Sequence, residues 1–174
     1  MPPHIDRLSP KRSVAIQGGA LVMFLVLTAV VATLGGMATY AGMDGWYASL
    51  AKPPLNPPDW VFGPVWTALY AMMAVAAWRI WRQPAPQVPG APSRARALGL
   101  WGGQLALNLL WPVLFFALKS PLAALGALVV QAIVLAAATW DFGVRDRMAG
   151  LLMVPVLLWV TFAGYLNGGV VVVN

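Results

Sequence analysis

The sequence predicts an all-α integral membrane protein built as a bundle of five transmembrane helices. Composition is the first reason: of 174 residues, 60% are hydrophobic and only 9% are charged, whereas a soluble domain averages about 25% charged residues. The second reason is that the apolar residues gather in five long runs separated by short polar segments. A helix needs about 20 apolar residues to cross a bilayer, so a chain of this length forms one membrane domain.

The expected membrane domain comprises residues 14–174. It follows a polar, proline-containing extension, residues 1–13, which is expected to be disordered and cytoplasmic. The spans are expected at about residues 14–40, 60–81, 97–118, 122–142 and 148–172. The first apolar run is far longer than the roughly 7–15 residues of a signal-peptide core, so it is interpreted as a span. Pro121 stands where the fourth span begins, a position that suits the first turn of a helix.

Lysine and arginine are distributed unevenly between the two ends of the predicted bundle. Nine of the eleven flank the N-terminal side of the first span, the second loop or the fourth loop, and only Lys52 and Lys119 lie on the other side. Because basic loops stay in the cytoplasm, the N-terminus is expected there. The net charge of +6 favours anionic lipid headgroups as partners. It does not indicate nucleic acid, because the basic residues lie between apolar runs and not along one face.

Residues 52–70, KPPLNPPDWVFGPVWTALY, combine a stiff loop with an aromatic helix. Five prolines fix φ and remove backbone donors, so the first half is expected to be an ordered, extended loop. Asp59 is expected to cap the helix that follows. Phe62, Trp66 and Tyr70 then fall on one face of that helix. Taken alone, such an aromatic stripe is more often helix packing than a binding site.

Four uncharged amides lie inside the predicted spans: Gln104, Asn108, Gln131 and Asn167. On the third span Gln104 and Asn108 share a helical face with Trp111 and Phe115. A polar group in the membrane needs a partner, so each amide is explained equally well by interhelical hydrogen bonding, worth about 0.6 kcal/mol per contact, and by a functional site. The amides together with aromatic faces on the second, third and fifth spans favour a pocket for a large, planar, amphipathic molecule.

The nearly opposite face of the third span carries small residues. Gly99, Gly103 and Ala106 form the small-xxx-small pattern that lets two helices approach closely. Pro112, on the same span, is expected to kink the helix near its polar face. The third span is therefore expected to have different roles on its two sides.

The residue inventory excludes several chemistries for the expected pocket. The chain has no cysteine and no glutamate, and its one histidine, His4, precedes the first apolar run. No metal site, cofactor or strong base is therefore expected within the spans. No carboxylate lies deep in a span, which argues against a proton relay or ion-coupled transport. No serine has a histidine partner, which excludes triad hydrolysis and leaves no catalytic residue to predict.

Three segments carry a specific pattern: WYASLAKPPLNPPDWVFGPVWTALY (46–70), QLALNLLWPVLFF (104–116) and PVLLWVTFAGYLN (155–167). In content, order and spacing they resemble the tryptophan-rich sensory protein / translocator protein family, also called the peripheral benzodiazepine receptor family. The resemblance covers the chain from about residue 14 onward. It implies a five-helix bundle that forms a homodimer, with a ligand cavity closed by the loop between spans 1 and 2. The expected dimer interface is the small face formed by Gly99, Gly103 and Ala106.

The resemblance also implies a set of ligand-binding residues. The family's cavity positions correspond here to Tyr47, Pro57, Phe62, Trp66, Tyr70, Gln104, Asn108, Trp111, Trp159, Ala163 and Asn167. Family ligands are porphyrins such as protoporphyrin IX and haem, sterols, and synthetic benzodiazepine-type compounds. The implied function is a membrane receptor, sensor or carrier for porphyrins and other planar amphipathic molecules, acting in tetrapyrrole homeostasis. The basic linker and short tail favour the inner membrane of a bacterium.

Two other functions stay open. Some bacterial members of the family degrade protoporphyrin in light and oxygen, and Trp66 and Trp159 match the implicated tryptophans, so an enzyme of that kind is the first alternative. The second is a transporter of small amphipathic molecules, although the sequence shows no inverted repeat or broken pair of helices. Leu55 stands where many members have an aromatic residue, and no basic residue follows Tyr165. The sterol-recognition pattern of some eukaryotic members is therefore missing.

Overall fold

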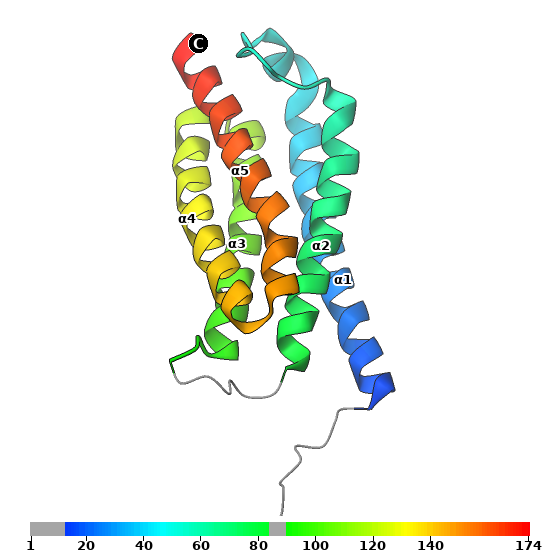
Figure 1. The fold of residues 1–174 in the computed structure, drawn as a ribbon. Helices are drawn as coiled ribbons and strands as arrows, with labels where there is room; N and C mark the ends of the chain where they lie inside the picture. The colour runs from blue at the N-terminus through cyan, green and yellow to red at the C-terminus, as the bar shows by residue number, and fades with distance from the viewer. Residues whose placement is uncertain (1–12, 84–89) are drawn as a thin grey trace, which may run out of the picture.

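The computed structural model describes residues 13–83 and 90–174, and the described chain is helical almost throughout. The expected disordered extension falls, except for Ser13, outside the described residues. Five long helices run along the molecule (Figure 1): α1 (Val14–Gly42), α2 (Phe62–Arg82), α3 (Arg94–Pro112), α4 (Pro121–Arg145) and α5 (Arg147–Val173). Three short segments join them: the π-helical turns η1 (Met43–Tyr47) and η3 (Val113–Ala117), and the 3-10 turn η2 (Asp59–Val61). Each long helix is long and apolar enough to cross a membrane, which confirms the predicted fold class.

Local sequence signals begin most of these helices. The side chain of Ser13 accepts a hydrogen bond from the backbone N–H of Ile16 at the start of α1. Ser93 caps α3 in the same way, and Pro121 occupies the first turn of α4, where its missing N–H costs nothing. Asp146 caps α5 by accepting from two backbone N–H groups in the first turn. These caps fix the chain direction at each entry into the bundle.

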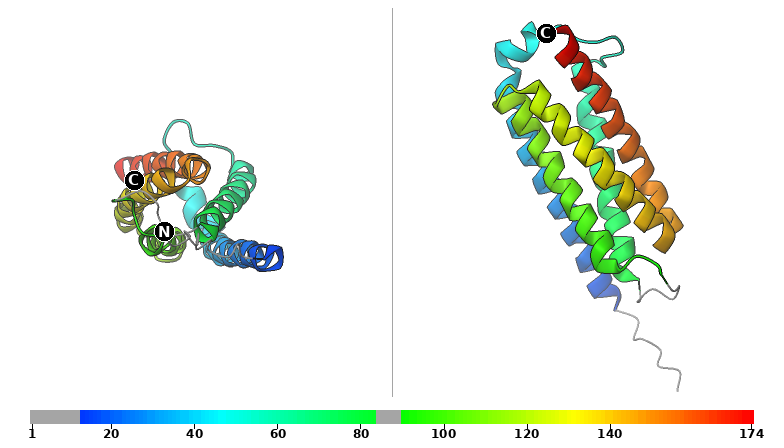
Figure 2. Two further views of the ribbon diagram at one scale, coloured as in Figure 1. Left: turned by 60° about the horizontal axis from the view of Figure 1, so that its bottom comes forward. Right: turned by 90° about the vertical axis from the view of Figure 1, so that its left-hand side faces the viewer.

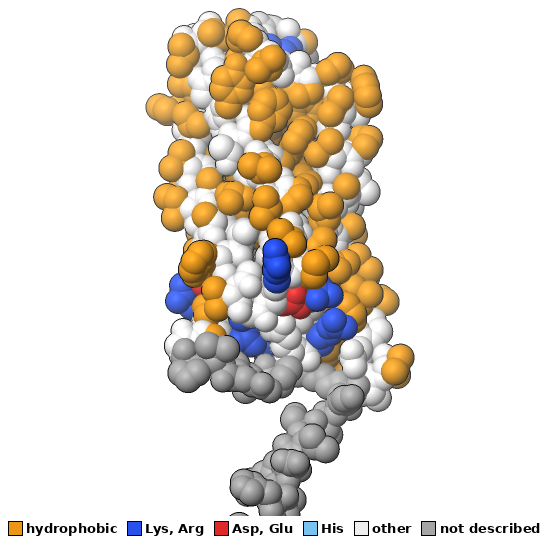
Figure 3. Space-filling view, viewed as in Figure 1, with side chains coloured by type: hydrophobic (Ala, Val, Ile, Leu, Met, Phe, Trp, Pro, Cys, Tyr) orange, Lys and Arg blue, Asp and Glu red, His pale blue; other side chains and the backbone are white. Residues whose placement is uncertain are grey.

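Most of the charged residues that the structure describes gather at one end of the molecule, while Lys52, Asp59 and Lys119 lie at the other. On the face shown in Figure 3, hydrophobic side chains cover most of the surface, while arginine and aspartate side chains cluster toward the lower end. There Arg79 forms an ion pair with Asp146 at 2.9 Å, and Arg96 lies 3.1 Å from the buried carboxylate of Asp141. Burial raises the pKa of Asp146, but hydrogen bonds from Arg79 and from the cap outweigh it and hold that pKa below its usual range. An apolar belt with a charged end is the pattern of a membrane bundle.

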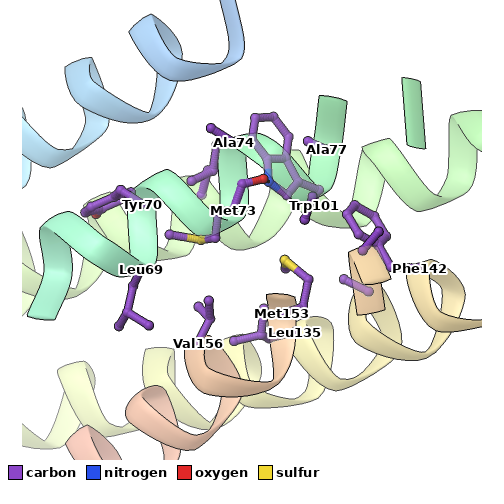
Figure 4. Close-up of a cluster of buried hydrophobic side chains, with 14 of the residues drawn as sticks. Leu69, Tyr70, Met73, Ala74, Ala77, Trp101, Leu135, Phe142, Met153 and Val156 are labelled. Carbon is purple, nitrogen blue, oxygen red and sulfur yellow. The ribbon is translucent and has the colours of Figure 1, made fainter. Parts of the chain in front are cut away.

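The core is built mainly by α2, α3, α4 and α5, and Phe24 of α1 joins it. Figure 4 shows side chains of α2, α3, α4 and α5 converging, and Figure 2 shows the helices packed side by side from two further directions. Met73, Phe142 and Met153 are completely buried there. The indole N–H of Trp101 on α3 donates to the backbone carbonyl of Met73 on α2 at 3.1 Å. This hydrogen bond fixes how the two helices sit against each other.

The two helices α4 and α5 meet through a pair of glycines. A Cβ added at Gly150 would lie 2.5 Å from the Cα of Gly143, whereas a Cβ at Gly143 would lie 4.0 Å from the Cα of Gly150. The backbones therefore touch, and the contact tolerates a side chain on one helix only. Small residues at such crossings let van der Waals packing hold membrane helices together.

The structure corrects the expected start of α2. Asp59 does not cap the helix through its side chain, because the chain makes the 3-10 turn η2 first. The backbone carbonyl of Asp59 accepts the N–H of Phe62, and no side chain caps α2 itself. The prediction was wrong because it placed a helix start directly after Pro58. The carboxylate of Asp59 is consequently free for another role.

The remaining differences concern helix ends. α3 begins at Arg94 and α4 continues to Arg145, beyond the predicted 97–118 and 122–142, because hydropathy marks the apolar portion of a helix and not its charged ends. The expected disturbance at Pro112 takes the form of the π-helical turn η3. Directly after η3, the backbone N–H of Leu118 donates a hydrogen bond to the carbonyl of Val113, five residues earlier, at 2.9 Å.

Candidate functional site

A cavity of about 280 Å³ lies at the end of the bundle where α1 is followed by η1 and where α2 begins. Walls from α1, η1, α2, α3, η3 and α5 surround it, together with the loop between η1 and η2 (residues 48–58, the lid loop). Its lining comprises Thr39, Met43, Tyr47, Asn56, Asp59, Phe62, Gly63, Trp66, Trp111, Phe115, Phe116, Ala163, Leu166, Asn167 and Val170. The lining is largely aromatic and aliphatic, which is the usual character of a small-molecule site.

Six residues predicted from the sequence line this cavity: Tyr47, Phe62, Trp66, Trp111, Ala163 and Asn167. They come from η1, α2, α3 and α5, so the structure brings together residues up to 120 positions apart in the sequence. Phe62 and Trp66 are one helical turn apart on α2, and Ala163 and Asn167 are one turn apart on α5. On each of these two helices, residues one turn apart thus line the cavity together.

Five predicted residues lie outside the cavity lining: Pro57, Tyr70, Gln104, Asn108 and Trp159. Tyr70 is buried in the core, with its ring centroid 5.5 Å from that of Trp66. Trp159 packs edge-on against Phe62 at 5.8 Å, so it supports the wall from behind. Its indole N–H is buried without a hydrogen-bond partner among the described residues.

Gln104 and Asn108 form a hydrogen-bonded pair inside the bundle. The amide nitrogen of Asn108 donates to the carbonyl oxygen of Gln104 at 2.9 Å, and the amide nitrogen of Gln104 lies 3.0 Å from the sulfur of Met73. Both side chains are buried. The bond between the two amides lies within α3, and only the contact of Gln104 with Met73 on α2 joins two helices, so interhelical hydrogen bonding describes Gln104 and not Asn108.

Asn167 fits both explanations, interhelical hydrogen bonding and a place in the cavity. Its carbonyl oxygen accepts the indole N–H of Trp111 at 3.0 Å, and its amide nitrogen donates to the carbonyl of Pro121 at 2.7 Å. The same side chain lines the cavity. Asn167 therefore joins α5 to α3 and to the start of α4 while holding the Trp111 ring in the wall.

Sequence reasoning placed Phe115 on the polar face of the third span but did not include it among the ligand-binding residues, and it missed Phe116; both belong to η3. Phe115 and Phe116 are both buried, both line the cavity and both contact the ring of Trp111, at 5.6 and 5.8 Å. Phe115 continues the helical face of Asn108 and Trp111, so that periodicity was an available signal. Phe116 lies outside the face, and its position depends on the π-helical turn after Pro112, which α-helical spacing does not describe.

The lid loop is fastened to the C-terminal part of α5. The side-chain amide of Asn174 makes two hydrogen bonds with the backbone of Ala51, at 3.0 and 3.1 Å. The hydroxyl of Tyr165 donates to the carbonyl of Pro54 at 3.0 Å, and Pro53 is buried against Gly169. Figure 1 shows this connection and the C-terminal end of α5 at the same end of the bundle. The proline-rich loop is therefore tied to a helix that comes more than 100 residues later.

Comparison with known proteins agrees with the architecture and the pattern of residues. A family model described as the TspO/MBR family matches residues 24–173. The tryptophan-rich sensory protein of Cereibacter sphaeroides is 40% identical over 140 residues, which cover 79% of this chain and 84% of the relative. The translocator protein of Bos taurus is 37% identical over 147 residues, covering 84% of this chain and 85% of the relative. Protein CrtK of Rhodobacter capsulatus is 33% identical over 150 residues, covering 85% and 90%. The resemblance found in the sequence is thus confirmed, and the chain belongs to the TspO/MBR family of membrane sensor and translocator proteins.

Proposed function

We propose that this protein is a membrane receptor or sensor that binds porphyrins, such as protoporphyrin IX and haem, and other planar amphipathic molecules in tetrapyrrole homeostasis. The observation that carries the proposal is the aromatic wall of the cavity. Trp66, Trp111 and Phe62 line it from two helices, and the ring of Trp111 stacks on Phe115 with 29° between the planes. Rings arranged in this way accept a flat ligand through its faces.

The size of the cavity constrains how such a ligand binds. At about 280 Å³ it lies just below the range of roughly 300–1,000 Å³ that is typical of small-molecule pockets. A porphyrin therefore enters with one edge first, and full insertion requires the lid loop to move. The chain has no cysteine, and no histidine is among the described residues of the lining. Binding is therefore expected to depend on the ring and not on the iron, so metal-free protoporphyrin should bind about as well as haem.

Light-driven degradation of protoporphyrin is a second candidate function. It is favoured by Trp66, which lines the cavity and whose indole would lie against a bound ring. Trp159, behind Phe62, has an unpartnered indole N–H among the described residues. Illumination of the protein with protoporphyrin distinguishes the two functions, because only an enzyme turns over many equivalents and loses that turnover in Trp66→Phe and Trp159→Phe.

Binding is tested by titrating the purified protein in lipid nanodiscs with protoporphyrin IX and following tryptophan fluorescence. We expect saturable quenching, weakened by Trp66→Ala by about 2- to 12-fold, which corresponds to the loss of one ring contact worth about 0.5–1.5 kcal/mol. Trp140→Ala is the matched control, because Trp140 is 72% exposed on α4 and lies outside the cavity lining. Quenching that never saturates, or that responds equally to both variants, would mean that porphyrins only partition into the apolar surface.

We also propose that the protein lies in a bacterial inner membrane with its N-terminus in the cytoplasm, because most of its basic residues lie at one end of the bundle. The chain has no native cysteine, so single cysteines report sidedness without background. Ser49→Cys and Ala95→Cys are suitable positions, since both residues are exposed at opposite ends of the bundle. We expect an impermeant maleimide to label Ser49→Cys from outside the membrane and Ala95→Cys only after the membrane is opened. Labelling of both from one side would refute this orientation.

A further inference from the structure

Several hydrogen-bond donors deep in the cavity are already used within the protein. The hydroxyl of Thr39 donates to the carbonyl of Gly35 at 2.9 Å. The indole N–H of Trp111 donates to Asn167, whose amide nitrogen donates through one of its two N–H groups to the carbonyl of Pro121. Thr39 and Asn167 still offer oxygen lone pairs to a ligand, and Asn167 keeps its second N–H. The described residues of the inner part therefore offer neutral groups only, and none of them carries a positive charge that would bind a carboxylate.

The mouth of the cavity adds a negative charge. The amide nitrogen of Asn56 donates to the carbonyl of Pro57 at 3.2 Å. Asp59 is the one charged side chain among the described residues that line the cavity. Because its side chain does not cap α2, the carboxylate is left as an acceptor at the rim.

Tyr47 lies near the carboxylate of Asp59, and Lys52 lies beside Tyr47. Burial raises the pKa of Tyr47, and the negative charge of Asp59 raises it further against a hydrogen bond from Asn56, so the carboxylate is felt within the cavity wall. The ammonium group of Lys52 lies 4.6 Å from the centre of the Tyr47 ring and 3.5 Å from its backbone carbonyl. Lys52 is not among the described residues that line the cavity, and its ammonium group lies over the ring of Tyr47.

We propose that Asp59 makes the site selective for the charge of the ligand's polar edge: it favours planar molecules whose edge carries hydrogen-bond donors or a positive charge, and disfavours those with free carboxylates. The proposal rests on the proposed function, since it ranks ligands of the same cavity. A carboxylate placed at the mouth would find no free cation in the lining and would face the Asp59 carboxylate. A neutral ester would avoid the repulsion, and an amine-bearing edge would gain an attraction.

The expected size of the effect follows from the exposure of Asp59. Two unit charges about 4 Å apart change a binding constant by about five-fold in bulk water, and by more near a protein surface. Because the Debye length is about 10 Å at 0.1 M salt and about 3 Å at 1 M, the selectivity should shrink as salt is added. Selectivity that comes from ring stacking alone has no such salt dependence.

The test compares three porphyrins that share one ring: protoporphyrin IX, its dimethyl ester, and its diamide with ethylenediamine, which carries two amines. Each is titrated into the full chain in neutral nanodiscs at pH 7.4, and empty nanodiscs give the partitioning background. We expect the diamide to bind at least five-fold more tightly than the ester, and the ester at least five-fold more tightly than the diacid. In Asp59→Asn the diacid should gain and the diamide should lose affinity by about five-fold each, while the ester stays unchanged.

Asp59→Glu is the matched control, because it keeps the charge and should keep the order of affinities. In 1 M salt the wild-type protein should approach the behaviour of Asp59→Asn. The proposal is overturned if the diacid binds the wild-type protein as well as the ester does, or if Asp59→Asn leaves the order unchanged. Failure of all three porphyrins to bind saturably is a different result, since it refutes the proposed function itself.

Discussion

Asn108 and Asn167 carry the same amide on neighbouring helices, yet only Asn167 reaches the cavity. The difference lies in their partners. Asn108 donates to Gln104 within α3, whereas Asn167 links α5 to Trp111 of the cavity wall. An amide inside a membrane bundle can thus bond within its own helix or join helices at a cavity wall, and the identity of the residue does not tell which.

We predict that Asn108→Ala lowers stability and leaves porphyrin affinity nearly unchanged. The substitution removes the donor to the buried carbonyl oxygen of Gln104, and an unsatisfied buried polar group costs about 1–3 kcal/mol. Thermal unfolding in detergent and the fluorescence titration measure the two effects separately. A loss of affinity larger than that of Trp66→Ala would instead place Asn108 in the binding site.

For single residues, sequence reasoning succeeded where helical periodicity decides the direction of a side chain. It placed Phe62 and Trp66 on one face of α2, and both line the cavity. Tyr70 continues the same face but is buried in the core one turn further along, because periodicity gives a direction and not a depth. Phe116 was missed because the π-helical turn that positions it follows from Pro112 only once the packing is known.

The lid loop and α5 act as one element, although the chain separates them widely. Three hydrogen bonds and the packing of Pro53 on Gly169 hold the loop over the end of the helix. Each neutral hydrogen bond contributes about 0.5–1.5 kcal/mol. The strength of this attachment should set how easily a ligand enters or leaves.

We predict that the double variant Tyr165→Phe, Asn174→Ala releases bound protoporphyrin at least tenfold faster, because it removes all three hydrogen bonds to the loop. Stopped-flow displacement measures the rate. Tyr40→Phe is the matched control, since Tyr40 is 80% exposed and lies outside the cavity lining. An unchanged release rate in the double variant would show that the lid loop does not limit exit.

The glycine pair between α4 and α5 makes an asymmetric prediction. Gly150→Ala would place a methyl group against the backbone of Gly143, whereas Gly143→Ala meets its neighbour at an ordinary contact distance. Overpacking of this kind costs about 1–3 kcal/mol. We therefore expect Gly150→Ala to lower the unfolding temperature clearly and Gly143→Ala to change it little, as measured by differential scanning fluorimetry. Equal effects would mean that helix propensity, and not the contact, controls both.

The molecule as a whole presents the small face of α3 on its surface. Gly99, Gly103 and Ala106 are exposed, and a Cβ added at Gly99 would meet nothing within 4 Å. An exposed row of small residues suits the close approach of a second bundle. The sequence indicated this face through its spacing alone, whereas the arrangement of the five helices around the cavity required contacts between distant residues.

We predict that the protein forms a homodimer through this face and that Gly99→Leu weakens it, because a large side chain would hold the two α3 helices apart. Gly18→Leu on α1 is the matched control, since a Cβ there also meets nothing within 4 Å. Crosslinking in bilayers measures the dimer, and porphyrin titration should be unaffected in both variants. An equally strong dimer in Gly99→Leu would exclude this face as the interface.

The hydrogen bonds between Ala51 and Asn174 also determine when, during synthesis, the lid loop can be attached. The two residues are 123 positions apart in the chain, and ribosomes add about 5–20 residues per second. A nascent chain therefore carries its lid segment for roughly 6–25 s before the ribosome has made the residue that secures it. For most of that interval α5 is incomplete, so the aromatic rings on α2 and α3 cannot yet close against it. We therefore expect a closed cavity, and with it ligand capture, only in a chain whose α5 has been inserted.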